Sequence, residues 1–386
     1  MNKRGTLFFI DNLRIALITL VIAHHAGQAY GPTGGFWYIE NADRASILSA
    51  FFVVNRSFFM SLFFMVSGYF LPASYDRKGT RDFLTDRLRR LGEPLLFFFF
   101  VVFPAMMYTY YLNFRHHGHL PFLVYYSQVY FGRGTRPLDW SGRWPDAQFG
   151  HLWFVEHLLV FAVCYSIWRL IHPRPGRFDS KGERLPRNLE IVVFTLALAA
   201  VTFVVRIWYP IDRWSAFLGF VQVAFADVPR DLSFFVIGVI AYRRNWFLNM
   251  PKKAGKLWLL VGLAAAACYY GLFLMGHPYF SAGGLNVQSL VYDFWEAFLC
   301  SGLCIGLLVF FRENLNSQGT LAKNLAASTY AVYVFHVPVV VFLQYAIWHT
   351  DLAAIIKFAI VTISAIPLTF LISSFIRRLP FVRRVL

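Results

Sequence analysis

Residues 8–25 read FFIDNLRIALITLVIAHH, and this stretch decides how the rest of the chain can fold. It is apolar over roughly the 20 residues that an α-helix needs to cross a membrane. It nevertheless carries Arg14 near one end and the pair His24 and His25 well inside. Ionisable side chains at membrane depth are energetically expensive, so their presence indicates a functional site.

Arg14 and His25 are predicted to lie on one face of this helix. Eleven steps of about 100° end about 20° from the starting direction, and a rise of about 1.5 Å per residue separates the two residues by about 16 Å. His24 points about 100° away from His25, which makes it the lesser candidate. We expect the remaining spans to pack around the Arg14–His25 stripe.

The composition is that of a membrane protein: 58% of the 386 residues are hydrophobic, 19% are aromatic and only 15% are charged. The net charge of +16 comes from short loops between apolar runs. Basic residues in such loops are typical of membrane proteins, where they set the orientation of the helices. We therefore expect no nucleic acid binding. The four cysteines lie in apolar runs and predict neither a disulfide framework nor a metal site.

The chain predicts an all-α polytopic membrane protein, a bundle of about ten transmembrane helices that forms a single domain over 1–386. The expected spans are about 8–30, 49–72, 94–113, 151–171, 189–209, 213–242, 257–276, 290–311, 325–345 and 353–375. The span 213–242 is expected to be a broken helix, interrupted at Asp227-Val228-Pro229-Arg230-Asp231. Such a break at membrane depth is tolerated where protein shields it or where it lines a cavity.

The distribution of basic residues orients the bundle. With the termini and loops 73–93, 172–188, 243–256 and 312–324 on one side, that side holds 24 Lys and Arg and the other side holds six. This split indicates that both termini are cytoplasmic. Arg87 and Arg90 then face the cytoplasm, where guanidinium groups are suited to phosphates; the alternative is charge that orients helices and contacts lipid headgroups.

Polar side chains recur in the later spans. His151, Glu156, Tyr333 and His336 fit either an acceptor-binding surface or hydrogen bonds between helices. His25 has a comparable alternative as a hydrogen-bonded core histidine, and Arg14 as an ion-pair partner of Asp11, three residues back on the same helix.

Several short motifs follow one another along the chain. Arg14 and His25 have ten residues between them, and Ser67-Gly68-Tyr69-Phe70 precedes Arg87-x-x-Arg90-Leu91 and Pro94. Later motifs are His151-Leu152-Trp153-Phe154, the run from Asp231 to Gly238, Ser328-Thr329-Tyr330 with Tyr333, and His336-Val337-Pro338. Together they resemble the acyltransferase family 3 membrane proteins, and the length and two of the motifs look closest to the branch of the periplasmic glucan biosynthesis protein C. Gly92-Glu93 departs from the commoner family spacing.

The resemblance implies a membrane O-acyltransferase of the inner (plasma) membrane. It would move an acetyl or succinyl group from cytoplasmic acyl-CoA (acetyl-CoA or succinyl-CoA) to a hydroxyl of an extracytoplasmic glycan, with no tightly bound cofactor. The expected catalytic residues are His25, as general base, and Arg14. The expected donor-binding residues are Arg87, Arg90 and Arg14, and the expected acceptor-binding residues are His151, Trp153, Glu156, Tyr333 and His336. Direct transfer and a covalent acyl-histidine both remain open, and no oligomeric state is predicted.

A proton-coupled secondary transporter or exporter is the alternative reading of the same stripe. It would also use buried His and Arg and a broken helix. Against it, no paired broken helices occur in corresponding halves of the chain. Binding of acyl-CoA distinguishes the two functions, because a transporter has no reason to recognise CoA. A purely structural or sensor protein would leave the Arg14–His25 stripe without a role.

Overall fold

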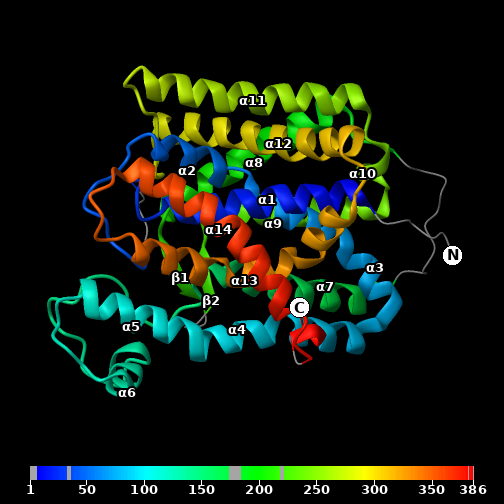
Figure 1. Cartoon of the computed structure of the whole chain (residues 1–386). Helices are drawn as coiled ribbons and strands as arrows, with labels where there is room; N and C mark the ends of the chain where they lie inside the picture. The colour runs from blue at the N-terminus through cyan, green and yellow to red at the C-terminus, as the bar shows by residue number, and fades with distance from the viewer. Residues whose placement is uncertain (1–6, 33–35, 174–183, 218–220, 381, 386) are drawn as a thin grey trace.

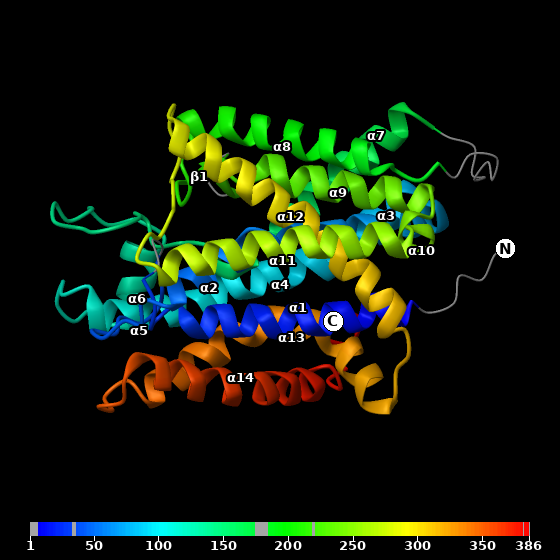
Figure 2. The same cartoon turned by 90° about the horizontal axis from the view of Figure 1, so that it is seen from above.

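Long helices that lie side by side form the molecule, and their ends gather at two opposite faces (Figures 1 and 2). A computed structural model describes residues 7–32, 36–173, 184–217, 221–380 and 382–385. Five basic residues of the orientation count, Lys3, Arg4, Arg174, Arg177 and Lys181, lie outside these ranges.

The long helices are α1 (Phe8–Gly27), α3 (Phe59–Arg87), α5 (Phe103–Phe114), α7 (Trp153–Ile171), α8 (Asn188–Trp208), α9 (Val228–Arg243), α11 (Lys252–Leu274), α12 (Val287–Asn314), α13 (Thr320–Ala346) and α14 (Ala354–Ile376). Shorter α-helices are α2 (Leu48–Arg56), α4 (Glu93–Phe97), α6 (Phe122–Tyr125) and α10 (Trp246–Asn249). Single turns of π-helix cover 88–92, 98–102 and 126–130, and single turns of 3-10 helix cover 150–152 and 382–384. Two short strands, β1 (Trp214–Phe217) and β2 (Val221–Ala224), form the one sheet among the described residues.

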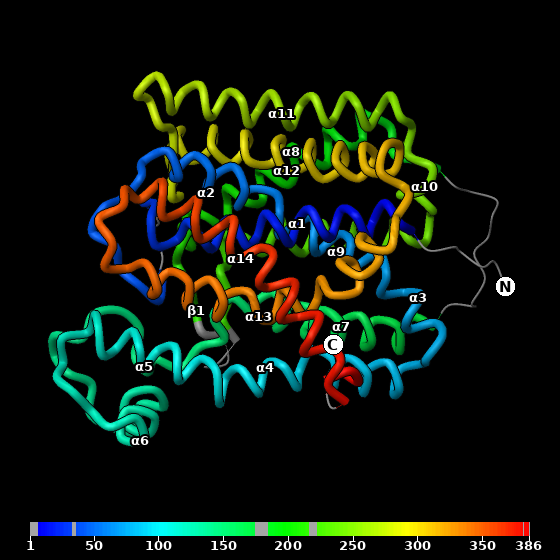
Figure 3. The backbone as a smooth tube through the Cα atoms, viewed as in Figure 1, coloured from blue at the N-terminus to red at the C-terminus, as the bar shows by residue number. Residues whose placement is uncertain are grey.

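Eight helical stretches of the described chain are long and apolar enough to cross a membrane, where the sequence predicts about ten. The stretch Leu48–Phe114 combines the predicted spans 49–72 and 94–113, and the chain reverses direction within it (Figure 3). In the sixth predicted span, α9 has only 16 residues. The all-α membrane bundle is thus confirmed, while the count of ten and the orientation of the termini remain predictions.

The basic segment 73–93 is helical, so the prediction of a loop there is wrong. Helical structure runs on through α3 to Arg87 and into the wide turn 88–92. Inside α3, Gly79 has φ 72° and ψ 172°, which is not helical. Glycine adopts such positive φ values readily because it has no Cβ. Gly79 is therefore the bend at which the chain turns back, and Arg87 and Arg90 lie on the returning helix.

The broken helix predicted over 213–242 is also wrong. Its first part is the antiparallel hairpin of β1 and β2, in which Trp214 pairs with Ala224 and Ser215 with Val223. Aromatic and β-branched residues favour strands over helices, and here they prevail over the apolar composition. The helix α9 begins only after Asp227, with Pro229 in its first turn, where its missing N–H costs little.

Helices α3 and α9 approach so closely that their backbones touch. A Cβ atom added at Gly238 would collide with the carbonyl oxygen of Met65, and one added at Gly68 would collide with that of Phe235. Small residues permit such contact between membrane helices, which gives close van der Waals packing in place of the hydrophobic effect. The two glycines therefore set the spacing of this helix pair.

We expect Gly238→Ala to destabilise the protein by about 1–3 kcal/mol, because the added methyl group forces α9 away from α3. The matched control is Gly271→Ala on α11, where a Cβ meets nothing within 4 Å. That substitution should stabilise by about 0.5–1 kcal/mol, since alanine restricts the unfolded chain. Thermal unfolding in detergent measures both shifts, and shifts of the same sign would contradict the close-contact account.

The connection between α5 and α7 is held by a buried ion pair. Arg115 donates to Asp146 at 3.0 Å, and the Tyr125 hydroxyl donates to the same carboxylate at 3.0 Å. Burial raises the pKa of the Asp146 carboxyl, although the Arg115 guanidinium beside it acts in the opposite direction. The ion pair thus joins the beginning of this long connection to its end, at the end of the bundle where α1 finishes (Figure 1).

Candidate active site

A cavity of about 680 Å³ opens between α1, α3, α7 and α13. From α1 it is lined by Asp11, Arg14 and Ile18, which follow one another at helical spacing on a single face. The side chain of Tyr333, on α13, also lines it. The Arg14 side of the predicted stripe therefore faces a cavity large enough for a small-molecule ligand.

One end of this cavity is basic. Arg14, Arg87, Arg90 and Lys323 all line it, so the structure brings together the three predicted donor-binding residues. Lys323 was not predicted, because a single lysine after a loop has no distinguishing pattern.

The arginines at the basic end differ in how well their charges are paired. Arg14 lies 3.6 Å from Asp11, the alternative partner that the sequence suggested, and Arg90 lies 3.6 Å from Asp86. The guanidinium of Arg87 lies 5.1 Å from the Phe83 ring, and its Nε is buried without a hydrogen-bond partner among the described residues. A buried donor without a partner is unfavourable, so Arg87 is the residue best placed to gain from a bound anion.

Three histidines meet deeper in the bundle. The ring centroids of His25 and His336 are 4.8 Å apart, and those of His336 and His151 are 4.9 Å apart. Trp37 stacks on His25 at 5.5 Å. Tyr333 connects this cluster to the cavity, because its ring lies 5.7 Å from that of His336 and its hydroxyl donates to the carbonyl oxygen of His151.

Backbone carbonyls define which ring nitrogens of the neutral histidines carry hydrogen. The Nδ1 atom of His336 lies 2.7 Å from the carbonyl oxygen of Tyr333, which can only accept, so Nδ1 is the donor and Nε2 the acceptor. That Nε2 lies 3.0 Å from Nδ1 of His25, which also lies 3.0 Å from the carbonyl oxygen of Val21. The hydrogen of His25 therefore sits on Nδ1, and its Nε2 keeps a free lone pair that can accept a proton.

Two predicted acceptor-binding residues lie apart from this cluster. Glu156 accepts from the backbone N–H of Gln222 at 3.3 Å, and the Trp153 ring lies 5.8 Å from that of Trp214. Both therefore face the β1–β2 hairpin, and neither lines the cavity. His24 packs against Phe52 and Phe59 at ring distances of 5.0 and 5.1 Å.

A buried ionic network was not predicted. Arg206 is fully buried and forms ion pairs with Asp227, Asp293 and Glu296. Further pairs in the same network join Arg230 to Asp227, Asp231 and Glu296, and Arg56 to Asp212 and Asp227. The partners come from α2, α8, α9 and α12, and no sequence spacing relates residues so far apart. Since buried charges are tolerated only when paired, the network holds these four helices together at one end.

Comparisons with known proteins agree with the sequence resemblance. The family described as "Acyltransferase domain" matches residues 7–374. Similar curated relatives include the Glucans biosynthesis protein C of Escherichia coli O81 (strain ED1a), of strain K12 and of O9:H4 (strain HS). Each is 22% identical over 348 residues, which cover 87% of this chain and 82% of the relative. The comparison with solved structures found no match.

Proposed function

This chain belongs to the acyltransferase family whose model spans residues 7–374, and from that premise we propose that it transfers an acetyl or succinyl group from cytoplasmic acyl-CoA to a hydroxyl of an extracytoplasmic glycan. It is an acyltransferase with several membrane-spanning helices. The names of its relatives, which refer to glucan biosynthesis, support a glycan acceptor. The basic loops support the inner (plasma) membrane, with the donor bound from the cytoplasm.

The observation that carries this proposal is a cavity with a basic end whose lining also includes Tyr333. The three histidines do not line the cavity, but the ring of Tyr333 lies 5.7 Å from that of His336. Phosphates of CoA bind Arg87, Arg14 and Lys323, which supply charge-assisted hydrogen bonds. The pantetheine arm follows the face of α1 toward Tyr333 and the histidines. Arg14 and His25 belong to one unbroken helix, so they lie about 16 Å apart along its axis. This distance corresponds to a pantetheine arm in an extended conformation.

In the transfer step, the acceptor oxygen attacks the thioester carbonyl carbon. The Nε2 atom of His25 takes the hydroxyl proton as the new C–O bond forms. The C–S bond then breaks, and the CoA thiolate recovers a proton from His25. His336 holds the His25 ring in the tautomer that this step needs.

The competing transporter reading loses one of its supports. It drew on a broken helix over 213–242, and this segment contains a hairpin followed by an intact helix. Nothing else in the described chain favours transport over acyl transfer.

The proposal is tested by binding and turnover of radiolabelled acetyl-CoA and succinyl-CoA by the purified protein in detergent. Transfer of label to a glycan acceptor supports it. Failure to bind either donor at high concentration would refute it and would make proton-coupled transport in proteoliposomes the next measurement.

We expect Arg87→Met to weaken donor binding by about tenfold to a hundredfold, the value of one charge-assisted hydrogen bond. Arg90→Met should have a smaller effect, because Arg90 is largely exposed and already faces Asp86. The matched control is Arg89→Met. Arg89 is as exposed as Arg90, lies between Arg87 and Arg90 in the sequence, and does not line the cavity. Equilibrium binding of acetyl-CoA measures all three, and equal losses in all of them would mean a diffuse charge effect instead of a site.

A further inference from the structure

A second cavity, of about 440 Å³, lies between α3, α8, α9, α10 and α12. It shares no lining residue with the proposed donor cavity. Most of its wall is apolar, including side chains of Met65, Ile191, Phe194, Phe234, Ile305 and Leu308. Its volume lies within the range of about 300–1,000 Å³ that is typical of sites for small organic ligands.

The charged groups of this pocket are at helix ends. Arg184 precedes α8, Glu190 lies in its first turn, and Arg244 follows the end of α9. The apolar residues Phe194 and Phe234 lie one or more turns deeper along the same helices. The pocket is therefore charged at its mouth and mostly apolar inside, with Ser301 as an inner polar side chain, which matches an amphiphilic ligand.

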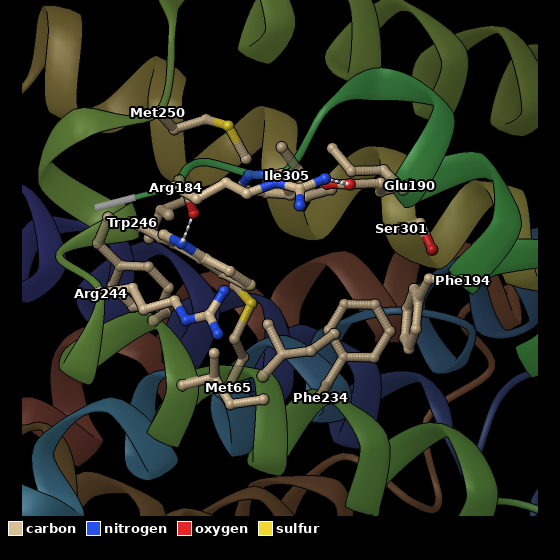
Figure 4. A pocket seen from close by; sticks show the side chains of 17 residues that line it. Met65, Arg184, Glu190, Phe194, Phe234, Arg244, Trp246, Met250, Ser301 and Ile305 are labelled. Carbon is tan, nitrogen blue, oxygen red and sulfur yellow. Dashed lines mark hydrogen bonds and ion pairs between the residues drawn. The ribbon is translucent and has the colours of Figure 1, made fainter. Parts of the chain in front are cut away.

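Charge at the mouth is net positive. Arg184 pairs with Glu190, and the Trp246 indole donates to the carbonyl oxygen of Arg184 at 3.1 Å (Figure 4). The guanidinium of Arg244 lies 5.8 Å from the Trp246 ring and points into the pocket (Figure 4). No carboxylate of the described residues forms an ion pair with Arg244. One guanidinium thus remains available to an anionic group.

We propose that this pocket binds one acyl chain of an anionic phospholipid from the cytoplasmic leaflet, with the lipid phosphate at Arg244 and Arg184. Basic pockets between membrane helices on the cytoplasmic side attract anionic headgroups, and the predicted orientation puts this mouth on that side. Beside the mouth, Leu189 and Val193 on α8 are 72% and 57% exposed, as expected of a surface that faces lipid. A chain can therefore enter from the bilayer without crossing water.

The test is photolabelling of the full-length protein in detergent with phosphatidylglycerol that carries a diazirine in one acyl chain. Phosphatidylcholine with the same chain is the comparison. We expect the label on pocket-lining segments of α8, α9 and α12, at about ten times the yield of the phosphatidylcholine probe. Arg244→Gln should lower the yield about tenfold, and Ile305→Trp, which fills the interior, should abolish it.

The control is Arg378→Gln, which removes an exposed basic residue that does not line the pocket and should leave labelling unchanged. Because Arg244 is exposed, its substitution keeps the test decisive even if Ile305→Trp fails to fold. Equal labelling by the two lipids, unchanged labelling of Arg244→Gln, or label outside the pocket would each overturn the proposal. Competition by acetyl-CoA would overturn it too, since the pocket would then belong to the donor. The readout needs no transfer activity, so it stands apart from the proposed function.

Discussion

His25→Gln is expected to lower the rate constant of acyl transfer by about 10²–10⁴-fold, the usual contribution of a positioned general base. Glutamine keeps a polar side chain of similar reach but cannot take up the acceptor proton. Donor binding should change little, because His25 is not among the residues that line the cavity. Single-turnover transfer from radiolabelled acetyl-CoA, together with equilibrium binding, separates the two effects.

His24→Leu is the matched control for this substitution. His24 is the adjacent residue on α1 but packs among phenylalanines, so leucine should preserve transfer. His336→Gln should lose about tenfold, since it removes the hydrogen bond that holds the His25 tautomer while leaving the base in place. A His25→Gln protein that retains more than a tenth of the wild-type rate would remove His25 from the chemistry.

Arg206→Met is expected to destabilise the folded protein by about 3–5 kcal/mol. The substitution leaves the buried carboxylate of Asp293 with no cationic partner among the described residues, while Asp227 and Glu296 keep only their pairs with Arg230 and Arg56. A buried charge that loses its partner has neither solvation nor pairing, which is why removing one member of such a pair is so unfavourable. Thermal unfolding in detergent, read as the fraction that remains monodisperse, measures the loss.

Two further variants identify charge pairing as the cause. Arg213→Met removes an exposed arginine at the same end of the bundle and should change stability by less than about 0.5 kcal/mol. The double variant Arg206→Met with Asp293→Asn should recover part of the loss, because it also removes one unpaired negative charge. No recovery in the double variant would mean that the loss comes from packing.

Hydropathy predicts most of the helices because an apolar run of membrane length has few other structures open to it. The predicted span 189–209 and the helix α8 at 188–208 differ by one residue at each end. The prediction failed where a local feature prevailed over composition. The strands β1 and β2 are as rich in apolar residues as a membrane-spanning helix, so their composition predicted a helix. The bend at Gly79 lies in a segment whose many charges predicted a loop.

The site was predictable to the extent that it lies on one helix. Arithmetic along α1 placed Arg14 and His25 on one stripe, and Arg14 faces the cavity. The contact of His25 with His336 joins residues 311 positions apart, so no spacing along the chain could predict it. The partners of Arg206 are Asp227, just before α9, and Asp293 and Glu296, both on α12. None of them is near Arg206 in the sequence, so the arginine looked like an isolated charge.

The hydrogen bonds that begin at His25 end at the carbonyl oxygen of Tyr333. A carbonyl oxygen cannot pass a proton on, so this chain is no conduit to bulk water on either side of the membrane. In the proposed mechanism, the proton that His25 takes from the acceptor would therefore pass from the same ring nitrogen to the departing thiolate. Under the proposed mechanism, acyl transfer would consume no proton-motive force, and the free energy of the donor thioester would drive it.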